Sequence, residues 1–257
     1  MLRKIKSALI VGSAPDAERL SNARMPTQTL IAVNNAWRIR SDFLYSVYPG
    51  DFPVERRAPN SIRHISNSEY MHSIDRAGGI TLCGATMAIA TGYWAADFLR
   101  PMVLGFAACN MVYQPGRTHF YGEGSADPLR EDVTLRSLEA KVCRMFLFAL
   151  SRGTLSVNTM PVEESRLVLP ILPLQELPTS RLGLWKLHRK AMRSPWCKEL
   201  LEFYAEQRNY ELRAPFPLLA HEYWIGKTEE DVAFIDTVDA KWAQSRQLVR
   251  DFLLQVA

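Results

Sequence analysis

Runs of consecutive apolar residues, each followed by small or polar residues, recur through the first two thirds of the chain. Strands buried on both faces of a parallel sheet carry such continuous runs instead of an alternating pattern. Helical patterns separate several of the runs, which is typical of an α/β fold with a mostly parallel sheet. The predicted strands are residues 7–12, 29–33, 42–47, 102–108 and 154–157, with a shorter one at 63–65.

Helical periodicity dominates the rest of the chain. Residues 81–99 are apolar almost all round, so we expect a buried helix there, and an amphipathic pattern predicts another over 132–152. After Pro161 prolines interrupt the apolar pattern, and only helical segments follow, at 181–193, 196–210 and 229–255. We therefore expect an α/β domain over residues 1–165 and a helical C-terminal lobe over 166–257.

Composition and charge indicate which kinds of partner and compartment to expect. The 257 residues are 47% hydrophobic and carry a formal net charge of +4, well below the dense basic patterning of a dedicated nucleic-acid binder. The four cysteines are widely spaced and predict buried thiols in a reducing compartment. No apolar run approaches the roughly 18 residues of a membrane span. We expect a cytoplasmic protein without a nucleic-acid partner, and leave homo-oligomerisation open.

Small and amide-bearing residues follow the predicted strands and predict a ligand crevice at the carboxyl edge of the sheet. Gly12 permits a tight turn, Ser13 or Asp16 can cap the following helix, and exposed N–H groups at a helix start attract phosphate. Amide side chains can hold a base, a ribose or a phosphate. The alternatives are a plain strand-to-helix turn and local turn formation. The amide candidates are Asn34, Asn35 and Asn110.

A long segment at 109–130 gathers the candidate groups for acid–base chemistry. His119 and Glu123 can each move a proton near neutral pH. The phenols of Tyr113 and Tyr121 can donate hydrogen bonds to a departing phosphate. A histidine that caps a helix or bonds a carbonyl is the alternative for His119.

Absent motifs are also informative. The chain has no Asp-x-Asp, HExxH, GxxxxGK[ST] or GxGxxG sequence. We therefore expect no metal site and no further cofactor. The absences argue against Mg²⁺-dependent transfer from a diphosphate sugar, against P-loop hydrolysis of ATP, and against a dinucleotide-dependent oxidoreductase.

Residues 181–198 interleave Lys and Arg with Leu, Met and Trp. A basic helix of this kind can lie on an anionic membrane, which would make the protein peripheral to the inner membrane. The alternative is a basic solvated face whose apolar side packs on the main domain.

Four short stretches together resemble the bacterial family-42 sialyltransferases that decorate lipooligosaccharide. Ile10-Val-Gly-Ser-Ala-Pro15 is similar to the family's Gly-Asn-Gly-Pro-Ser loop, and Val33-Asn34-Asn35 to its Cys-Asn-Gln strand end. Ala88-Ile-Ala-Thr-Gly-Tyr93 is similar to its Ala-Ile-Ala-Leu-Gly-Tyr helix end. Thr118-His-Phe-Tyr-Gly122 is similar to its Ser-His-Tyr-Ile-Gly segment. The likeness covers about residues 9–146.

The resemblance implies a Rossmann-like, GT-A-like fold and inverting, metal-independent transfer of a sialic-acid-like or other 2-keto sugar. A CMP-sugar would be the donor, and a surface glycan or glycolipid the acceptor. By position, Gly12, Ser13 and Asn34 would hold the nucleotide. Glu123 stands where the family has its catalytic His, so Glu123 or His119 would be the base, or activity would be lost.

Further residues match the family's pattern more loosely. Tyr113 and Tyr121 would contact the phosphate, Asn110 matches an Asp of the family, and Arg76 matches an arginine that we expect to contact substrate. The alternative function is a non-catalytic nucleotide- or glycan-binding protein of the same fold.

Overall fold

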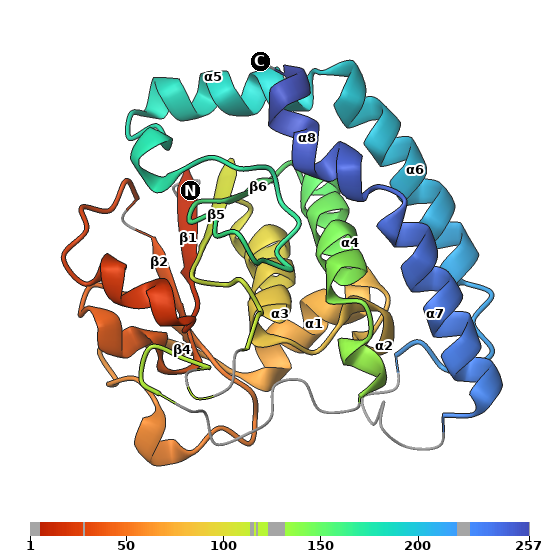
Figure 1. Cartoon of the computed structure of the whole chain (residues 1–257), viewed down its shortest axis with the longest axis horizontal. Coiled ribbons are helices and arrows are strands. Elements are labelled where there is room, and N and C mark those ends of the chain that lie inside the picture. Colours follow the sequence, from red (N-terminus) through yellow and green to blue (C-terminus); the bar gives the residue numbers. More distant parts are fainter. Residues whose placement is uncertain are drawn as a thin grey trace.

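A computed structural model describes residues 6–27, 29–113, 116, 118–122, 132–219 and 227–256. All strands of the sheet run parallel, in the spatial order β4-β3-β2-β1-β5-β6 (Figure 1). The predicted α/β fold, Rossmann-like with a C-terminal helical lobe, is confirmed. The strands are β1 Ser7–Val11, β2 Leu30–Val33, β3 Tyr45–Val47, β4 Arg63–Ile65, β5 Val103–Ala107 and β6 Leu155–Asn158.

The reversal of strand order at β1 explains why the two faces of the sheet differ. Right-handed crossovers on opposite sides of β1 place their connections on opposite faces. One face carries short 3-10 helices, including Pro15–Leu20 and Asn34–Ile39. The other carries the α-helices. These are α1 Asn67–Ala77, α2 Ile80–Cys83, α3 Met87–Trp94, α4 Leu138–Ser151, α5 Arg181–Met192, α6 Pro195–Glu211, α7 Glu229–Ala243 and α8 Arg246–Val256.

The helix predicted at 81–99 is interrupted after its first turn, between α2 and α3. Gly84 has φ +92, a conformation that only glycine adopts without strain, and it separates α2 from α3. A Cβ at Gly84 would lie 2.7 Å from Cδ of Lys141, whose buried side chain passes over this break. The last turn of the helix is a π-helix at Ala95–Leu99.

Three other predicted helices also differ from the structure. The first is a 3-10 helix that follows Ala14, without a side-chain cap from Ser13 or Asp16. The helix predicted at 132–152 begins at Leu138, because Ser137 takes a left-handed φ of 44, which a helix cannot continue through. The pattern at 229–255 is two helices, separated at Ser245, whose hydroxyl donates to Trp242 O.

One hydrophobic cluster continues from the sheet into the helices after residue 166. A buried salt bridge adds to it, because Arg144 of α4 donates two hydrogen bonds to Glu211 of α6, at 2.6 and 2.8 Å. Trp242 of α7 donates its indole N–H to the same carboxylate. The helical lobe therefore shares its core with the α/β part. As predicted, all four cysteines are buried thiols.

None of the described helices is long and apolar enough to cross a membrane.

Candidate functional site

The loops that follow β1 and β5 lead away to opposite sides of the sheet, since strand order reverses between these two strands. In open parallel sheets, ligands bind at the carboxyl ends of the strands at such a switch point. Gly12 and Ser13 follow β1, and Ala108 to Met111 follow β5. This switch-point crevice is the candidate site.

Gly12 brings the two loops together. Its N–H donates to Ala107 O at 2.9 Å, and the N–H of Ala14 donates to Ala108 O at 3.2 Å. A Cβ at Gly12 would lie 2.2 Å from Ala108 O and 2.8 Å from Sγ of Cys109. The glycine therefore serves loop packing, and its own N–H is already bonded within the protein.

Strained backbone gathers at the same edge of the sheet. Asn34 at the end of β2 and Ala108 and Met111 after β5 have left-handed φ values of 52, 52 and 56. Such a conformation costs a non-glycine residue on the order of 1–3 kcal/mol, and it persists where the surrounding structure enforces it, often at functional sites. The strain therefore marks the crevice as a candidate site independently of any motif.

Buried acceptor oxygens without partners lie beside the strained loops. Both carboxylate oxygens of Asp16 and the side-chain oxygens of Asn34 and Asn35 are buried and accept no hydrogen bond from another described residue. An unpaired buried acceptor is costly, so a ligand that brings hydrogen-bond donors would stabilise this group of oxygens. The sequence suggested Asp16 only as a helix cap, and its place in the site was missed.

The electrostatics of Asp16 agree with its burial. Burial raises the pKa of the Asp16 carboxyl, and its own backbone N–H and the charge of Arg19 offset part of that effect. Burial raises the pKa of the Cys109 thiol to about 12, and the charge of the neighbouring Asp16 contributes to this rise. The carboxylate of the β1 loop thus faces the loop that follows β5.

His119 belongs to a short segment, residues 118–122, that packs on the β1 loop. The N–H of Phe120 donates to Ser13 O at 3.0 Å, and the Phe120 ring packs against Ala14, Ala17 and Ala108. This contact fixes residues 118–122 over the crevice. Burial lowers the pKa of His119, so its imidazole is neutral near pH 7.

The ring of His119 is held from two sides. It stacks on Tyr121 with ring centroids 4.9 Å apart, and it lies 5.9 Å from the ring of Tyr113. Its Nδ1 lies 2.8 Å from Oγ1 of Thr118. When Nδ1 carries the proton and donates to this hydroxyl, Nε2 keeps a lone pair that can accept a proton.

Tyr113 brings a protonated phenol to the crevice. Burial and the neighbouring Cys109 raise its pKa to about 12, and the Arg166 guanidinium lowers it in part. Arg166 was not predicted. The backbone N–H of Arg166 donates to Asn110 O at 2.9 Å, which brings residues after β6 against the β5 loop. A phenol and a guanidinium together suit an anionic ligand group.

Three other predicted site residues are not shown to face the crevice. The Asn110 side chain accepts from Val112 N–H at 3.3 Å, so its oxygen belongs to a local turn. Arg76 donates to Asp97 at 2.8 Å, and Asp97 also contacts Arg152 shortly before β6. That pair lies at the amino edge of the sheet, away from the crevice. Glu123 lies outside the described residues.

No group of three or more His, Cys, Asp or Glu side chains suited to hold a metal occurs in the part of the chain that the structure describes. The sequence matches no protein-family model, and the searches of curated proteins and of solved structures gave no match.

Proposed function

We propose that this protein is an inverting glycosyltransferase that moves a sialic-acid-like or other 2-keto sugar from CMP to a hydroxyl of a surface-glycan acceptor without a metal. The observation that carries the proposal is the set of buried, unpartnered oxygens at the switch point, from Asp16, Asn34 and Asn35. A ligand rich in hydrogen-bond donors would satisfy these oxygens, and a phosphorylated nucleoside in a Rossmann-like crevice is such a ligand.

The nucleotide supplies the missing donors. Ribose hydroxyls and the cytosine amino group donate hydrogen bonds, which the Asp16 carboxylate and the two amide oxygens can accept. The phosphate would lie toward Tyr113 and Arg166, where a phenol and a guanidinium can stabilise charge as the leaving group departs. The sequence has no Asp-x-Asp motif of the kind that holds a metal for transfer from a diphosphate sugar.

His119 would act as the general base. In the proposed step, the acceptor oxygen attacks the anomeric carbon of the sugar while Nε2 takes the acceptor's proton. The bond from that carbon to the phosphate oxygen breaks, and CMP leaves with the bonding electrons. The lowered pKa of His119 keeps the base unprotonated at neutral pH.

Release of CMP from a panel of CMP-activated 2-keto sugars tests the proposal directly. In EDTA, with and without glycan acceptors, we expect release from one donor that exceeds its spontaneous hydrolysis and depends on His119. Binding of CMP without any release would favour the non-catalytic alternative. Release that requires Mg²⁺, or that His119→Gln leaves unchanged, would contradict the proposed mechanism.

A further inference from the structure

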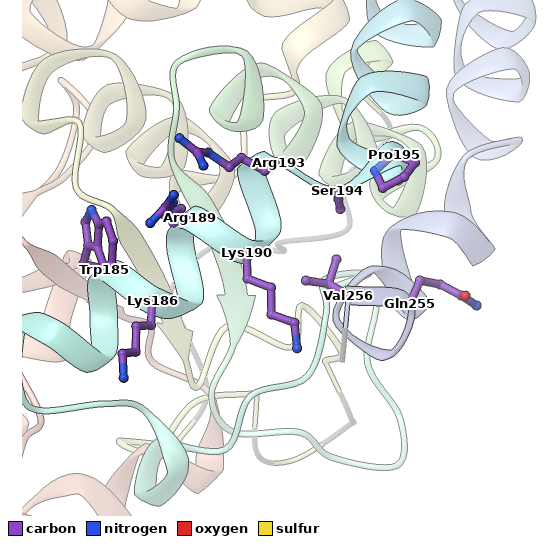
Figure 2. A pocket seen from close by; sticks show the side chains of 9 residues that line it. All are labelled: Trp185, Lys186, Arg189, Lys190, Arg193, Ser194, Pro195, Gln255 and Val256. Carbon is purple, nitrogen blue, oxygen red and sulfur yellow. The ribbon is translucent and has the colours of Figure 1, made fainter.

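A basic groove lies between α5 and the end of α8, far from the crevice. It has a volume of about 580 Å³, and α5 lines it with Trp185, Lys186, Arg189 and Lys190, with Arg193 directly after the helix. Figure 2 shows Trp185, Arg189 and Arg193 in one row and Lys186 and Lys190 in a second row beside it, with Lys190 extending toward Val256 of α8. The groove is open and shallow, unlike a cavity that encloses a small molecule.

The segment 177–198 carries all of the excess positive charge of the chain. It contains six Lys or Arg residues and no Asp or Glu. The whole chain has 31 Lys and Arg against 27 Asp and Glu, so the rest has 25 against 27 and is slightly acidic. No carboxylate of a described residue forms an ion pair with Lys186, Arg189 or Arg193.

Large apolar side chains stand exposed among these cations. Leu182 and Trp185 are 59% and 43% exposed, three residues apart and therefore on one face of the helix. The guanidinium of Arg189, one turn further on, lies 4.9 Å from the centre of the Trp185 ring. The combination of an aromatic ring, an aliphatic side chain and cations is typical of helices that lie in a membrane interface.

The opposite face of α5 is fixed to the protein. Leu184 and Ala191 are buried in the main core. Nε2 of His188 lies 2.8 Å from Gly153 O, shortly before β6 begins. The cations and Trp185 are therefore presented on a rigid helix at the amino edge of the sheet (Figure 1).

We propose that α5 and the groove beside it dock the protein on a bilayer that contains anionic phospholipid. Several cations attract the charged headgroups, and Trp185 and Leu182 enter the interface between headgroups and acyl chains. Because α5 lies at the amino edge and the crevice at the carboxyl edge, the docked protein keeps the crevice open to solution. This inference stands independently of the nucleotide bound there.

Co-sedimentation of the full chain with vesicles tests the docking. Vesicles of phosphatidylcholine alone are compared with vesicles that contain about one third phosphatidylglycerol, at low and high salt. We expect the protein to sediment with the anionic vesicles only, and less at high salt because exposed charges are screened. The triple variant Lys186→Glu, Arg189→Glu, Arg193→Glu should weaken partition by at least about tenfold, and Trp185→Ala by several-fold.

The control variant makes the same change in charge elsewhere on the surface. Arg24, Arg38 and Arg213 are exposed and lie outside 177–198, so their replacement by Glu should leave most of the binding. All substituted side chains are exposed, and unchanged melting temperatures will show that each variant is folded. Equal loss in both triple variants would contradict a specific docking surface. The proposal would be overturned if the protein failed to bind anionic vesicles. It would also be overturned if the protein bound a soluble polyanion such as heparin but not the vesicles.

Discussion

Asp16 is the residue whose environment says most about the site. Its carboxylate is buried and accepts no hydrogen bond from another described residue, and its own backbone N–H and the Arg19 charge offset only part of the cost of burial. In the proposed site, a ligand supplies the remaining partners. Replacing a residue of this kind should stabilise the free protein and weaken ligand binding. Replacing a residue with a structural role would instead destabilise the protein.

Asp16→Asn should therefore stabilise the free protein while it weakens nucleotide binding. A raised carboxyl pKa means that the folded state holds the proton more tightly, so stability falls as pH rises from about 4 through the raised pKa. The gain in melting temperature should be present at pH 7 and absent near pH 4. CMP affinity should fall by about tenfold or more. A variant less stable at pH 7 with unchanged CMP affinity would contradict this role.

His119→Gln should lower turnover by about 10²–10⁴-fold with little change in CMP affinity. Because burial lowers the pKa of His119, wild-type activity should be constant above about pH 6.5 and fall as the imidazole becomes protonated at lower pH. The variant should lose this acidic limb. His72, an exposed histidine of α1, supplies the matched control, and His72→Gln should keep both rate and pH profile.

At the scale of elements, the contact between the β1 loop and the β5 loop shapes the crevice. Gly12→Ala should lower the free energy of unfolding by about 1–3 kcal/mol, because the added Cβ would overlap Ala108 O. Gly50→Ala is the control, since its Cβ would meet Asn67 at an ordinary 3.7 Å. Urea denaturation measures both variants. Equal midpoints would show that the two loops are not tightly packed.

Strands were the part of the fold that the sequence predicted best. Continuous apolar runs mark buried parallel strands directly, and each predicted strand is present within a few residues. Helix ends were harder, because the interruptions at Gly84, Ser137 and Ser245 depend on tertiary contacts or backbone conformation that periodicity does not reveal.

Two sequence features located parts of the site: the residues that follow a strand, and the long segment after β5 that carries Tyr113 and His119. Gly12, Asn34 and Asn35 could be placed at the carboxyl edge by the first feature. Arg166 could not, because a long-range hydrogen bond brings it to Asn110. Arg76 was placed by analogy, but its pairing with Asp97 holds it at the amino edge. Asp16 carried no signal beyond its type, since only the structure shows that its oxygens lack partners.

At the scale of the whole molecule, the salt bridge between Arg144 and Glu211 joins the helical lobe to the α/β part. Both side chains are 1% exposed, so loss of the carboxylate leaves a buried, unpaired guanidinium. Glu211→Ala should cost about 3–5 kcal/mol of stability. Glu206→Ala, an exposed change on the same helix, should cost little. Thermal unfolding of the two variants compares them, and equal melting temperatures would contradict the structural role of the pair.

Isothermal titration calorimetry in EDTA measures the binding of CMP to the switch-point crevice. We predict a single site with a Kd below about 1 mM, weaker binding of UMP and AMP, and a clear loss of affinity in Asp16→Asn but not in Gly50→Ala. Absence of binding by folded protein at several times that concentration, or equal affinity in both variants, would show that the switch-point crevice is not a cytidine-nucleotide site.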